Sequence, residues 1–419
     1  MTILLVTDAF PPVCGGSGWS TFELARGLRA RGHAVLVVKV LAGSSAMETE
    51  ATYDGLRVIE FQAYAPGLPG VRNYFKNERL YARLAPRLEQ LIAAHQIDIV
   101  HGQHVLSVPP SVEAARRAGI PSVATVRDYW PICYRSDLMH TTRTLAWCPG
   151  CSHAAAVQAG RPTIGVHGLA MMLIAKYLRS NLDRKQRALA SADAVIAVSS
   201  TLAADLKARA PLLAATRIDV IPNPVNADAV RARVLPQPLL AGDYALYVGK
   251  LAPNKGTQHL IGVAERAHLD WPLVIVGDGP DRAMLEREAA TSESDVRFVG
   301  WQDPVQTATW MAHASMLIFP SHGPESLSRV LIEASGLGLP IAAMRTGGTG
   351  DIITDEVTGL LSATPDELAR DVKRLRNDGE LRRRLGKAAA LNARDRFDAS
   401  AVVARIDALY TSLLGAQRT

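Results

Sequence analysis

Short apolar runs that end in loops containing glycine or proline recur along this chain, and they constrain its fold more than any other feature. Residues 3–6 form the first run. The Gly15-Gly16-Ser17-Gly18 loop, a helical pattern over 22–28 and a second apolar run over 34–40 follow it. Strand, glycine loop, helix and strand make a βαβ unit, whose two strands lie parallel. The sequence therefore predicts an α/β fold built on parallel sheets.

The same rhythm forms two series along the chain. The first continues with predicted strands at 97–100, 122–125, 194–198 and 218–221. The second follows Pro222-Asn223-Pro224, with predicted strands at 245–248, 273–276, 297–300, 316–319 and 341–343 and helices at 258–267, 282–290, 304–312 and 327–335. Two doubly wound, Rossmann-like domains that face a central crevice explain both series, and ligands of such sheets bind at the carboxyl ends of the strands.

The predicted domain boundaries follow from these two series. Residues 1–225 form the first domain and residues 226–400 the second, with the proline-rich stretch 223–242 as the linker. A long charged helix is predicted over 368–396. Apolar residues at helical spacing between 401 and 414 predict a final helix. We expect this last segment, 401–419, to pack back on the first domain.

The positive charge of the chain is concentrated in its first half. The net charge is +6, and residues 1–225 contain 24 Lys and Arg against 16 Asp and Glu. Such a surplus favours an anionic partner, phosphate or a lipid headgroup, although a solvated basic surface explains it equally well. Because no recognition module accompanies the charge, we expect no nucleic acid partner.

The same half contains a candidate membrane-binding helix. Residues 164–189 combine apolar side chains with Lys176, Arg179, Arg184, Lys185 and Arg187, which is typical of a helix lying on an anionic membrane. The alternative is a core helix with a solvated basic end. The chain start has no signal-peptide pattern, and no 18-residue apolar run occurs. We therefore expect a cytoplasmic protein that can associate peripherally with the inner face of the membrane.

Two glutamates eight residues apart, Glu325 and Glu333, form the most informative local motif. If a helix begins near Ser326, its first amides make an anion site at the carboxyl edge of the sheet. Glu325 then lies at the mouth of that site and Glu333 two turns further along the same face. A carboxylate accepts paired hydrogen bonds from a sugar diol. The alternative is a helix cap and a solvated residue.

Two lysines, Lys250 and Lys255, follow the first strand of the second series. Two cations in such a loop suit a diphosphate, whose charge must be neutralised when no metal is present. A pair of exposed lysines is the alternative. The nearby turns at Gly249 and at Gly277-Asp278-Gly279 are weaker signals, since such turns close many βα units without a ligand.

In this order, the motifs resemble glycosyltransferase family 4, whose members are retaining enzymes of the GT-B fold. The likeness covers nearly the whole chain, from the glycine loop at 15–18 through Asp98-Ile-Val-His101 and Ile221-Pro222-Asn223 to the Glu-x7-Glu run. The combination is highly specific, although each motif alone is not.

The resemblance implies a role for each matching position. Lys250 and Lys255 would bind the donor diphosphate, Glu333 the ribose hydroxyls and Glu325 the transferred sugar. The remaining donor-binding positions would be Gly15, Gly16, Gly249, Gly277, Asp278 and the backbone amides of Ser326 and Leu327. The donor would be a nucleotide-diphosphate sugar, and no metal or other cofactor is required.

The sequence departs from the family where its members usually have His-Asp after the fourth strand, because Arg127-Asp128 stands there. An arginine cannot act as a base, but it can clamp a phosphate bidentately. We keep Arg127 among the candidate catalytic residues, with His101 as a substitute imidazole if it reaches the crevice. The family's Glu-Gly-Phe-Gly is Glu325-Ser-Leu-Ser here, which predicts a stiffer loop.

Three cysteines, Cys133, Cys148 and Cys151, lie close in sequence to His140 and His153. These residue types suit a structural zinc, but the spacing is not a standard one. Free thiols are the alternative that we favour, so no metal is assigned.

The sequence thus predicts a retaining glycosyltransferase that moves a sugar from a nucleotide-diphosphate donor to a glycan or lipid-linked acceptor, in cell-surface polysaccharide synthesis. A nucleotide-sugar epimerase of similar architecture is one alternative. A non-catalytic nucleotide-sugar-binding protein is another, which Arg127 keeps open.

Overall fold

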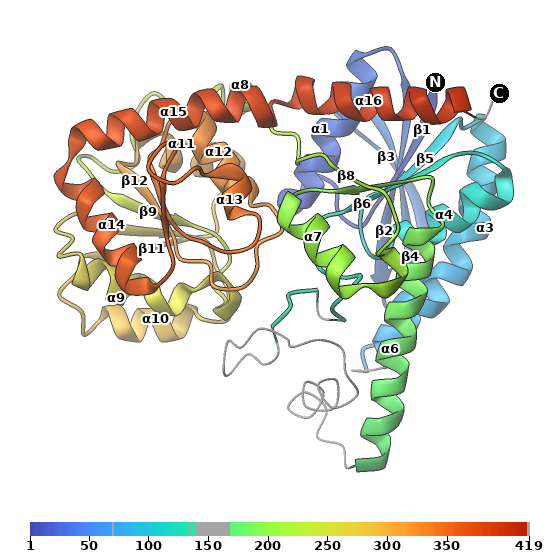
Figure 1. Ribbon diagram of the computed structural model, residues 1–419, viewed down its shortest axis with the longest axis horizontal. Helices are drawn as coiled ribbons and strands as arrows, with labels where there is room; N and C mark the ends of the chain where they lie inside the picture. The colour runs from blue at the N-terminus through green and yellow to red at the C-terminus, as the bar shows by residue number, and fades with distance from the viewer. Residues whose placement is uncertain (69–70, 135, 140–167, 417–419) are drawn as a thin grey trace. The chain divides into compact units, whose positions relative to one another are not determined.

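The computed structural model describes all residues except 69–70, 135, 140–167 and 417–419. The chain divides into two compact units. Unit 1 contains the described residues of 1–224 together with 399–416, and unit 2 contains residues 225–398. Each unit holds one sheet, coloured blue to green in unit 1 and yellow to orange in unit 2 (Figure 1).

The sheet of unit 1 has the strand order β3-β4-β2-β1-β5-β6-β7-β8. All neighbouring strands are parallel except β3 and β4, which form an antiparallel pair at the edge. The strands are β1 (Thr2–Thr7), β2 (Ala34–Gly43), β3 (Met47–Tyr53), β4 (Leu56–Tyr64), β5 (Ile99–Gly102), β6 (Ser122–Val126), β7 (Ala194–Ala197) and β8 (Ile218–Val220).

Helices cover both faces of this sheet. Successive strand residues point to opposite faces. Ile3 and Leu5 therefore pack with α1 and α16, while Leu4 and Val6 pack with α3 and α4. The helical elements are α1 (Gly16–Ala30), α2 (Val71–Tyr74), the π-helix η1 (Phe75–Arg79), α3 (Leu80–His95), α4 (Val108–Ala118), α6 (Gly168–Ala190), α7 (Ser200–Arg209), the 3-10 helix η2 (Pro211–Leu213) and α16 (Ala399–Ala416).

The last helix, α16, returns to unit 1 after the chain has completed unit 2. It lies along α1 (Figure 1) and buries Val402, Val403 and Ile406 in the core. His33 Nε2 lies 2.8 Å from an Asp407 oxygen, which ties the loop after α1 to this helix. The apolar face of α16 is thus an integral part of the unit 1 core.

The sheet of unit 2 consists of six parallel strands in the order β11-β10-β9-β12-β13-β14. Numbered within the unit, this order is 3-2-1-4-5-6, that of a doubly wound dinucleotide-binding sheet. The strands are β9 (Ala245–Val248), β10 (Leu273–Val276), β11 (Val296–Gly300), β12 (Met316–Phe319), β13 (Ile341–Met344) and β14 (Leu360–Ser362). The predicted α/β class with two Rossmann-like units is confirmed.

Helices α9 and α14 pack together and close one face of the unit 2 sheet, while α11 and α12 contact each other and strands of the sheet. The helical elements are α8 (Ala227–Arg231), the 3-10 helices η3 (Pro253–Lys255) and η4 (Thr257–His259), α9 (Leu260–Arg266), α10 (Arg282–Ala289), α11 (Pro304–His313), α12 (Arg329–Leu337), α13 (Thr349–Ile352), α14 (Pro365–Asn377) and α15 (Gly379–Phe397).

Two sequence-based expectations about these elements were wrong, and the strands β3 and β4 were missed. The predicted linker 223–242 contains α8, which packs on α12 within unit 2. The edge strand β3 was missed because its side chains are exposed or half-buried, so its sequence has no apolar run. The predicted long helix 368–396 is two helices, because the Asp378 side chain accepts a hydrogen bond from Leu381 N (2.8 Å) and so starts α15.

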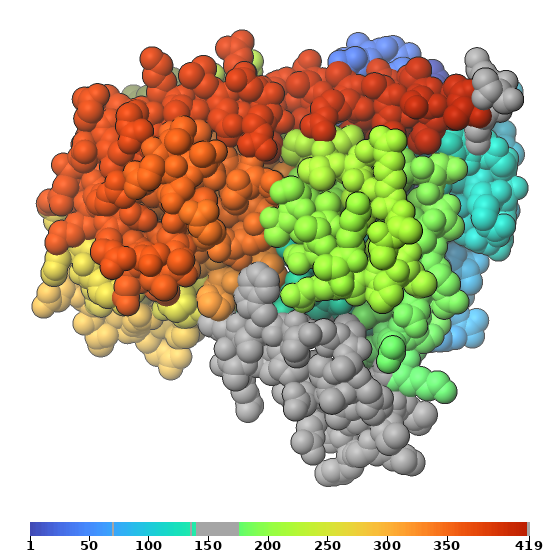
Figure 2. Space-filling model, viewed as in Figure 1, coloured from blue at the N-terminus to red at the C-terminus, as the bar shows by residue number. Residues whose placement is uncertain are grey.

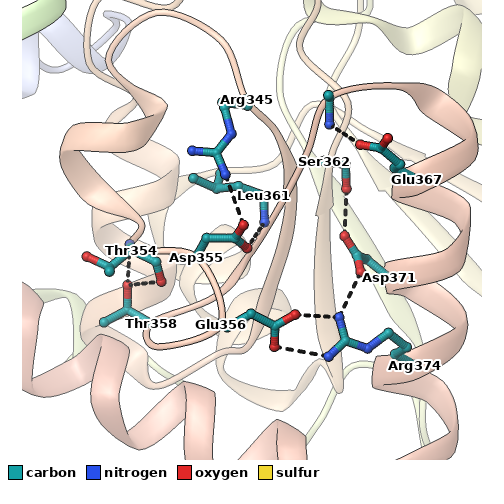
Figure 3. A network of polar contacts seen from close by, with 11 residues as sticks. Arg345, Thr354, Asp355, Glu356, Thr358, Leu361, Ser362, Glu367, Asp371 and Arg374 are labelled. Atoms are coloured by element: carbon teal, nitrogen blue, oxygen red, sulfur yellow. Dashed lines mark hydrogen bonds and ion pairs between the residues drawn. The ribbon is translucent and has the colours of Figure 1, made fainter.

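A network of charged and polar side chains joins the segment before β14 to α14 (Figure 3). Arg374 binds both carboxylate oxygens of Glu356, at 2.7 and 3.0 Å, and Asp371 accepts a hydrogen bond from the Ser362 hydroxyl (2.8 Å). Figure 2 shows α14 and α15 on the visible surface of unit 2. Because Arg374 and Glu356 are about half exposed, their pair contributes about 0–1 kcal/mol to stability.

Replacing Asp378 with alanine should destabilise unit 2 by about 1 kcal/mol, because α15 loses the oxygen that caps its first turn. Asp378→Asn, whose side-chain oxygen also caps well, is the matched control and should unfold at nearly the wild-type urea concentration. Urea unfolding followed by circular dichroism measures both. Equal losses in the two variants would contradict the cap.

Candidate functional site

The carboxyl ends of β9 and β12 carry the residues that the sequence singled out in the second domain. These two strands are neighbours at the point where the strand order of unit 2 reverses. Ligands of doubly wound sheets bind beside this switch point. The loop after β9 contains Lys250 and Lys255, and the loop after β12 leads to Glu325.

Lys255 and Glu325 form an ion pair at this edge. Lys255 Nζ lies 2.6 Å from Glu325 Oε1, and the Ser321 hydroxyl donates to the same oxygen at 2.5 Å. The Glu325 side chain is 9% exposed and that of Lys255 is 33% exposed. Two donors on one oxygen fix the carboxylate, and charge-assisted hydrogen bonds of this kind are the stronger ones. Two candidate site residues of opposite charge, Lys255 and Glu325, are therefore in direct contact.

Backbone hydrogen bonds hold the two loops against each other. Asn254 O accepts from His322 N (3.2 Å) and Gly323 N (2.8 Å), so the Lys255 loop is tied to the segment before Glu325. On the other side, Glu325 O accepts from Gly348 N at 2.6 Å. The glutamate thus lies between two backbone anchors.

Three glycines allow these close approaches, and each has a positive φ. A Cβ on Gly256 (φ +67°) would lie 1.8 Å from Pro320 O, and one on Gly347 (φ +47°) would lie 2.1 Å from Glu325 O. A Cβ on the predicted donor residue Gly277 (φ +136°) would lie 1.9 Å from the carbonyl oxygen of Gly249. No residue with a side chain fits at these positions without moving a loop.

The helix after Glu325 begins later than the sequence suggested. It was expected near Ser326, but α12 begins at Arg329, and the Ser328 hydroxyl accepts from Leu331 N (3.5 Å) as its cap. Ser328 is a good cap, which places Ser326 and Leu327 in the preceding loop. The backbone amides of Ser326 and Leu327, predicted to bind sugar or phosphate, therefore belong to a loop and not to the first turn of a helix.

Glu333 lies on α12 and makes a contact that sequence reasoning missed. Arg329 Nε lies 2.6 Å from Glu333 Oε1, and the two side chains are only 9% and 18% exposed. Because Arg329 and Glu333 are four residues apart in a predicted helix, the sequence could have indicated this ion pair. Glu333 is therefore a half-buried, oriented carboxylate and not a solvated one.

Lys250 and Asp278 lie at the more open part of the edge. Lys250 is exposed, and its backbone oxygen accepts from the Tyr247 hydroxyl (2.9 Å). Asp278 accepts from Gly279 N (2.7 Å) and pairs with Arg282 (3.1 Å). The Lys250 side chain is therefore open to solvent, whereas Asp278 stabilises the turn after β10.

In unit 1, Gly15 and Gly16 lie at the N-terminus of α1. Gly15 is the N-cap residue, both glycines are exposed, and a Cβ on Gly15 would meet nothing within 4 Å. The first turn of α1 is therefore exposed, and the packing around Gly15 does not require a glycine there.

Arg127 follows β6 and is 8% exposed. Its guanidinium donates to Gln103 Oε1 at 2.5 Å and to Asn223 Oδ1. Two of its nitrogens are thus already engaged inside unit 1, which limits the predicted bidentate clamp on a phosphate.

His101 has an interior position on β5 with no exposed surface. One ring nitrogen lies 2.5 Å from the Tyr410 hydroxyl of α16 and the other 2.6 Å from the Thr125 hydroxyl. Burial, followed by the charge of Arg127, lowers the pKa of His101 well below its ordinary value. A buried imidazole with two satisfied nitrogens holds α16 to the sheet, so we leave His101 out of the proposed site.

The same edge of unit 1 holds polar residues that sequence reasoning missed, namely Asp8, Gln103 and His104. Asp8 follows β1, and the other two follow β5, the neighbouring strand. Burial raises the pKa of Asp8 to about 7, and burial together with Arg127 lowers the pKa of His104 to about 3. Their position just after the ends of strands, like that of Lys250, could have marked them in the sequence as candidate site residues.

Most of the candidate zinc ligands, including His140 and His153, lie outside the described residues. Cys133 is buried, while Cys148 and Cys151 lie outside the described residues. Within the described part of the chain, no three His, Cys, Asp or Glu side chains are grouped as a metal site requires. None of the described helices is both long and apolar enough to cross a membrane.

Gly256→Ala should destabilise unit 2 more than Gly242→Ala. Both glycines have a positive φ, which costs an alanine about 1–2 kcal/mol, but a Cβ on Gly242 meets nothing within 4 Å. The clash with Pro320 O should cost Gly256→Ala about 1–3 kcal/mol more. Urea unfolding of both variants measures the difference, and equal losses would contradict the close approach.

Asp8→Asn should become increasingly stabilising as the pH rises. Because burial raises the pKa of Asp8 from 3.8 to about 7, the folded protein binds this proton more tightly than the unfolded chain does. Wild-type stability should therefore fall between pH 3.8 and about 7 relative to Asp8→Asn, and the difference should level off above pH 7. Unfolding at a series of pH values measures it. A constant difference across this range would contradict a raised pKa.

Solved structures resemble this chain over its whole length. Sucrose-phosphate synthase from Thermosynechococcus elongatus matches with a TM-score of 0.69 and 20% identity, covering 99% of each chain. HepE from Anabaena, solved with UDP-glucose, matches with a TM-score of 0.66 and 19% identity, covering 98% of this chain and 100% of that one. These likenesses show the GT-B fold that the sequence predicted.

Curated relatives match in sequence. Glycogen synthase of Mycobacterium tuberculosis is 26% identical over 447 residues, covering 100% of this chain and 96% of that protein. D-inositol 3-phosphate glycosyltransferase of Salinispora tropica is 28% identical over 74% of this chain and 63% of that protein. An uncharacterized glycosyltransferase of Methanocaldococcus jannaschii is 31% identical over 151 residues, which span only 42% of that protein.

Two family models together cover most of the chain. Glycosyltransferase Family 4 matches residues 14–229, and Glycosyl transferases group 1 matches residues 240–391. The first match spans more than half of the sequence and includes the glycine loop and Arg127. The second includes both lysines and both glutamates of the unit 2 edge. The chain therefore belongs to glycosyltransferase family 4.

Proposed function

We propose that this protein is a retaining glycosyltransferase that moves a sugar from a nucleotide-diphosphate donor to a glycan or lipid-linked acceptor. The observation that carries the proposal is the Lys255–Glu325 pair, held by two loops at the switch point of a doubly wound sheet in a family 4 chain. The solved complexes of HepE with UDP and UDP-glucose support a nucleotide-sugar donor at such a fold.

The charges at the unit 2 edge suit the donor. Lys250 is exposed and Lys255 is one-third exposed, so both ammonium groups can reach a diphosphate. Positive charge placed where the leaving diphosphate becomes more negative stabilises the transition state without a metal. The buried Glu325 carboxylate would accept hydroxyl donors of the transferred sugar, and Glu333 those of the ribose.

Retention requires the acceptor to attack the face from which the diphosphate leaves. The bond between the anomeric carbon and the diphosphate oxygen breaks, and a bond from the same carbon to the acceptor oxygen forms. The acceptor proton passes to the departing phosphate oxygen, so no protein base is consumed. An arginine at position 127 is compatible with this route, because the route asks for no imidazole there.

The acceptor and its location are the least constrained part of the proposal. On α6, Lys176 and Arg179 are exposed and can contact an anionic membrane surface, whereas Lys185, expected on the same basic face, is buried. These cations support a lipid-linked acceptor of cell-surface polysaccharide synthesis. The epimerase and the non-catalytic binding protein gain no support from the relatives named above.

Screening UDP-, GDP- and ADP-sugars by thermal shift should identify a donor, since a bound ligand raises the unfolding temperature. With that donor, Glu325→Ala and Lys255→Ala should each lower transfer at least about 100-fold, as expected for a lost charged contact in the transition state. Both variants should stay folded. Product analysis by mass spectrometry and NMR reports the new glycosidic bond and its configuration.

The matched controls are Glu380→Ala and Lys373→Ala, which remove the same charges from exposed positions on α15 and α14. They should keep wild-type activity. Full activity of Glu325→Ala or Lys255→Ala, or an altered free nucleotide sugar as the only product, would overturn the assignment. An inverted anomeric configuration would overturn the retaining mechanism alone.

A further inference from the structure

Three polar side chains at the carboxyl edge of the unit 1 sheet each carry a buried atom with no hydrogen-bond partner among the described residues. These atoms are Asp8 Oδ1, Gln103 Nε2 and His104 Nε2. Their residues follow β1 and β5, adjacent strands at the switch point of this sheet, and Gln103 N donates to Val6 O (2.9 Å) across the two strand ends. Buried polar atoms are normally paired, so three unpaired ones together need an explanation.

The bonds of Thr7 determine which nitrogen of His104 carries a proton. The Thr7 hydroxyl donates to Ala9 O at 2.8 Å, so its oxygen can only accept from His104 Nδ1, 3.2 Å away. With the Thr7 proton on Ala9 O, we assign the hydrogen of this pair to His104 Nδ1. In the neutral ring Nε2 then has a free lone pair. Burial and the charge of Arg127 lower the pKa of His104, which keeps the ring neutral. His104 Nε2 is thus an unpaired acceptor.

Asp8 supplies a second acceptor. Its Oδ2 accepts from Leu106 N at 2.9 Å, and the nearby Ser107 hydroxyl also acts on this carboxyl and lowers its pKa. Oδ1 is buried and has no hydrogen bond in the described part of the chain. The residue as a whole is only half-buried, so the carboxyl lies where the edge of the sheet meets the surface. An acceptor without a donor in such a place is costly unless a ligand supplies the hydrogen.

Gln103 supplies a donor. Its side-chain oxygen faces Arg127, which can only donate, so the orientation of the amide is determined. The Nε2 group is left with no acceptor. Above pH 7, where the Asp8 carboxyl is ionised, the three residues offer two acceptors and one donor from neighbouring strand ends.

We infer that Asp8, Gln103 and His104 form a hydroxyl-binding subsite for a sugar or polyol ring of the acceptor. Hydroxyl groups donate and accept at once, so neighbouring hydroxyls satisfy all three atoms. A phosphodiester has no hydrogen to donate and would meet two acceptors, one of them a carboxylate. A zinc ion needs three or four ligands, and only two of these atoms are potential ligands. The inference rests on the proposed transferase function and adds residues to its acceptor half.

The test uses methyl α-D-glucopyranoside, methyl α-D-mannopyranoside and myo-inositol as probes of the full-length protein, with binding followed by ligand-observed NMR. At least one probe should bind the wild type in the millimolar range. Asp8→Asn should weaken that binding at least about tenfold. In Asp8→Asn the side-chain oxygen must accept from Leu106 N, so the amide nitrogen, a donor, takes the position of Oδ1. His104→Phe should weaken binding to a similar extent, since it keeps a ring but no lone pair.

Asp98→Asn is the matched control, because Asp98 also accepts a backbone hydrogen bond (2.7 Å from Thr2 N) but lies at the opposite end of the same strands. It should bind the probes like the wild type. Thermal unfolding checks that each variant is folded, and calorimetry with UDP, ADP and GDP reports the unit 2 site separately. That binding should be unchanged in all variants.

No probe binding to the wild type, or equal binding by wild type, Asp8→Asn and His104→Phe, would overturn the subsite. If His104→Phe does not fold, the comparison of Asp8→Asn with Asp98→Asn decides alone. Failure of the transferase proposal would look different, because the wild type would then bind no nucleoside diphosphate and use no nucleotide sugar.

Discussion

The carboxyl edge of the unit 2 sheet depends on backbone segments that approach more closely than any side chain would allow. Gly256 lies against Pro320 O, Gly277 against Gly249 O and Gly347 against Glu325 O. These approaches bring the ends of β9, β10, β12 and β13 into one rigid rim. That rim positions Lys250, the Lys255–Glu325 pair and the helix that carries Glu333.

The two sheets use the same geometry and differ in how their edges are satisfied. In unit 2, Lys255 pairs with Glu325 and Arg329 with Glu333, while the Lys250 side chain is exposed. In unit 1, Asp8 Oδ1 and His104 Nε2 find no partner among the described residues. We therefore keep the donor on unit 2 and the acceptor on unit 1 as parts of the proposal.

Sequence patterns predicted β9, β10 and β12 to the residue, because a strand buried on both faces reads as a short apolar run. They also indicated Glu325, Glu333 and both lysines. They failed where tertiary contacts decide. The start of α12 depends on the cap at Ser328, and β3 is exposed and pairs only with β4. His101 is hydrogen-bonded to Tyr410, which is more than 300 residues away in the chain.

The sequence by itself determined the class of the protein: two doubly wound units, their order, and the charged residues at the strand ends of the second. Periodicity and loop composition are local properties, and these conclusions need nothing else. Only the tertiary structure decided which polar groups meet. It paired Arg127 with Gln103 and Asn223, buried His101 and left Asp8 and His104 with unused acceptors. Hydrogen-bond satisfaction joins residues distant in the chain, and no spacing along the sequence encodes it.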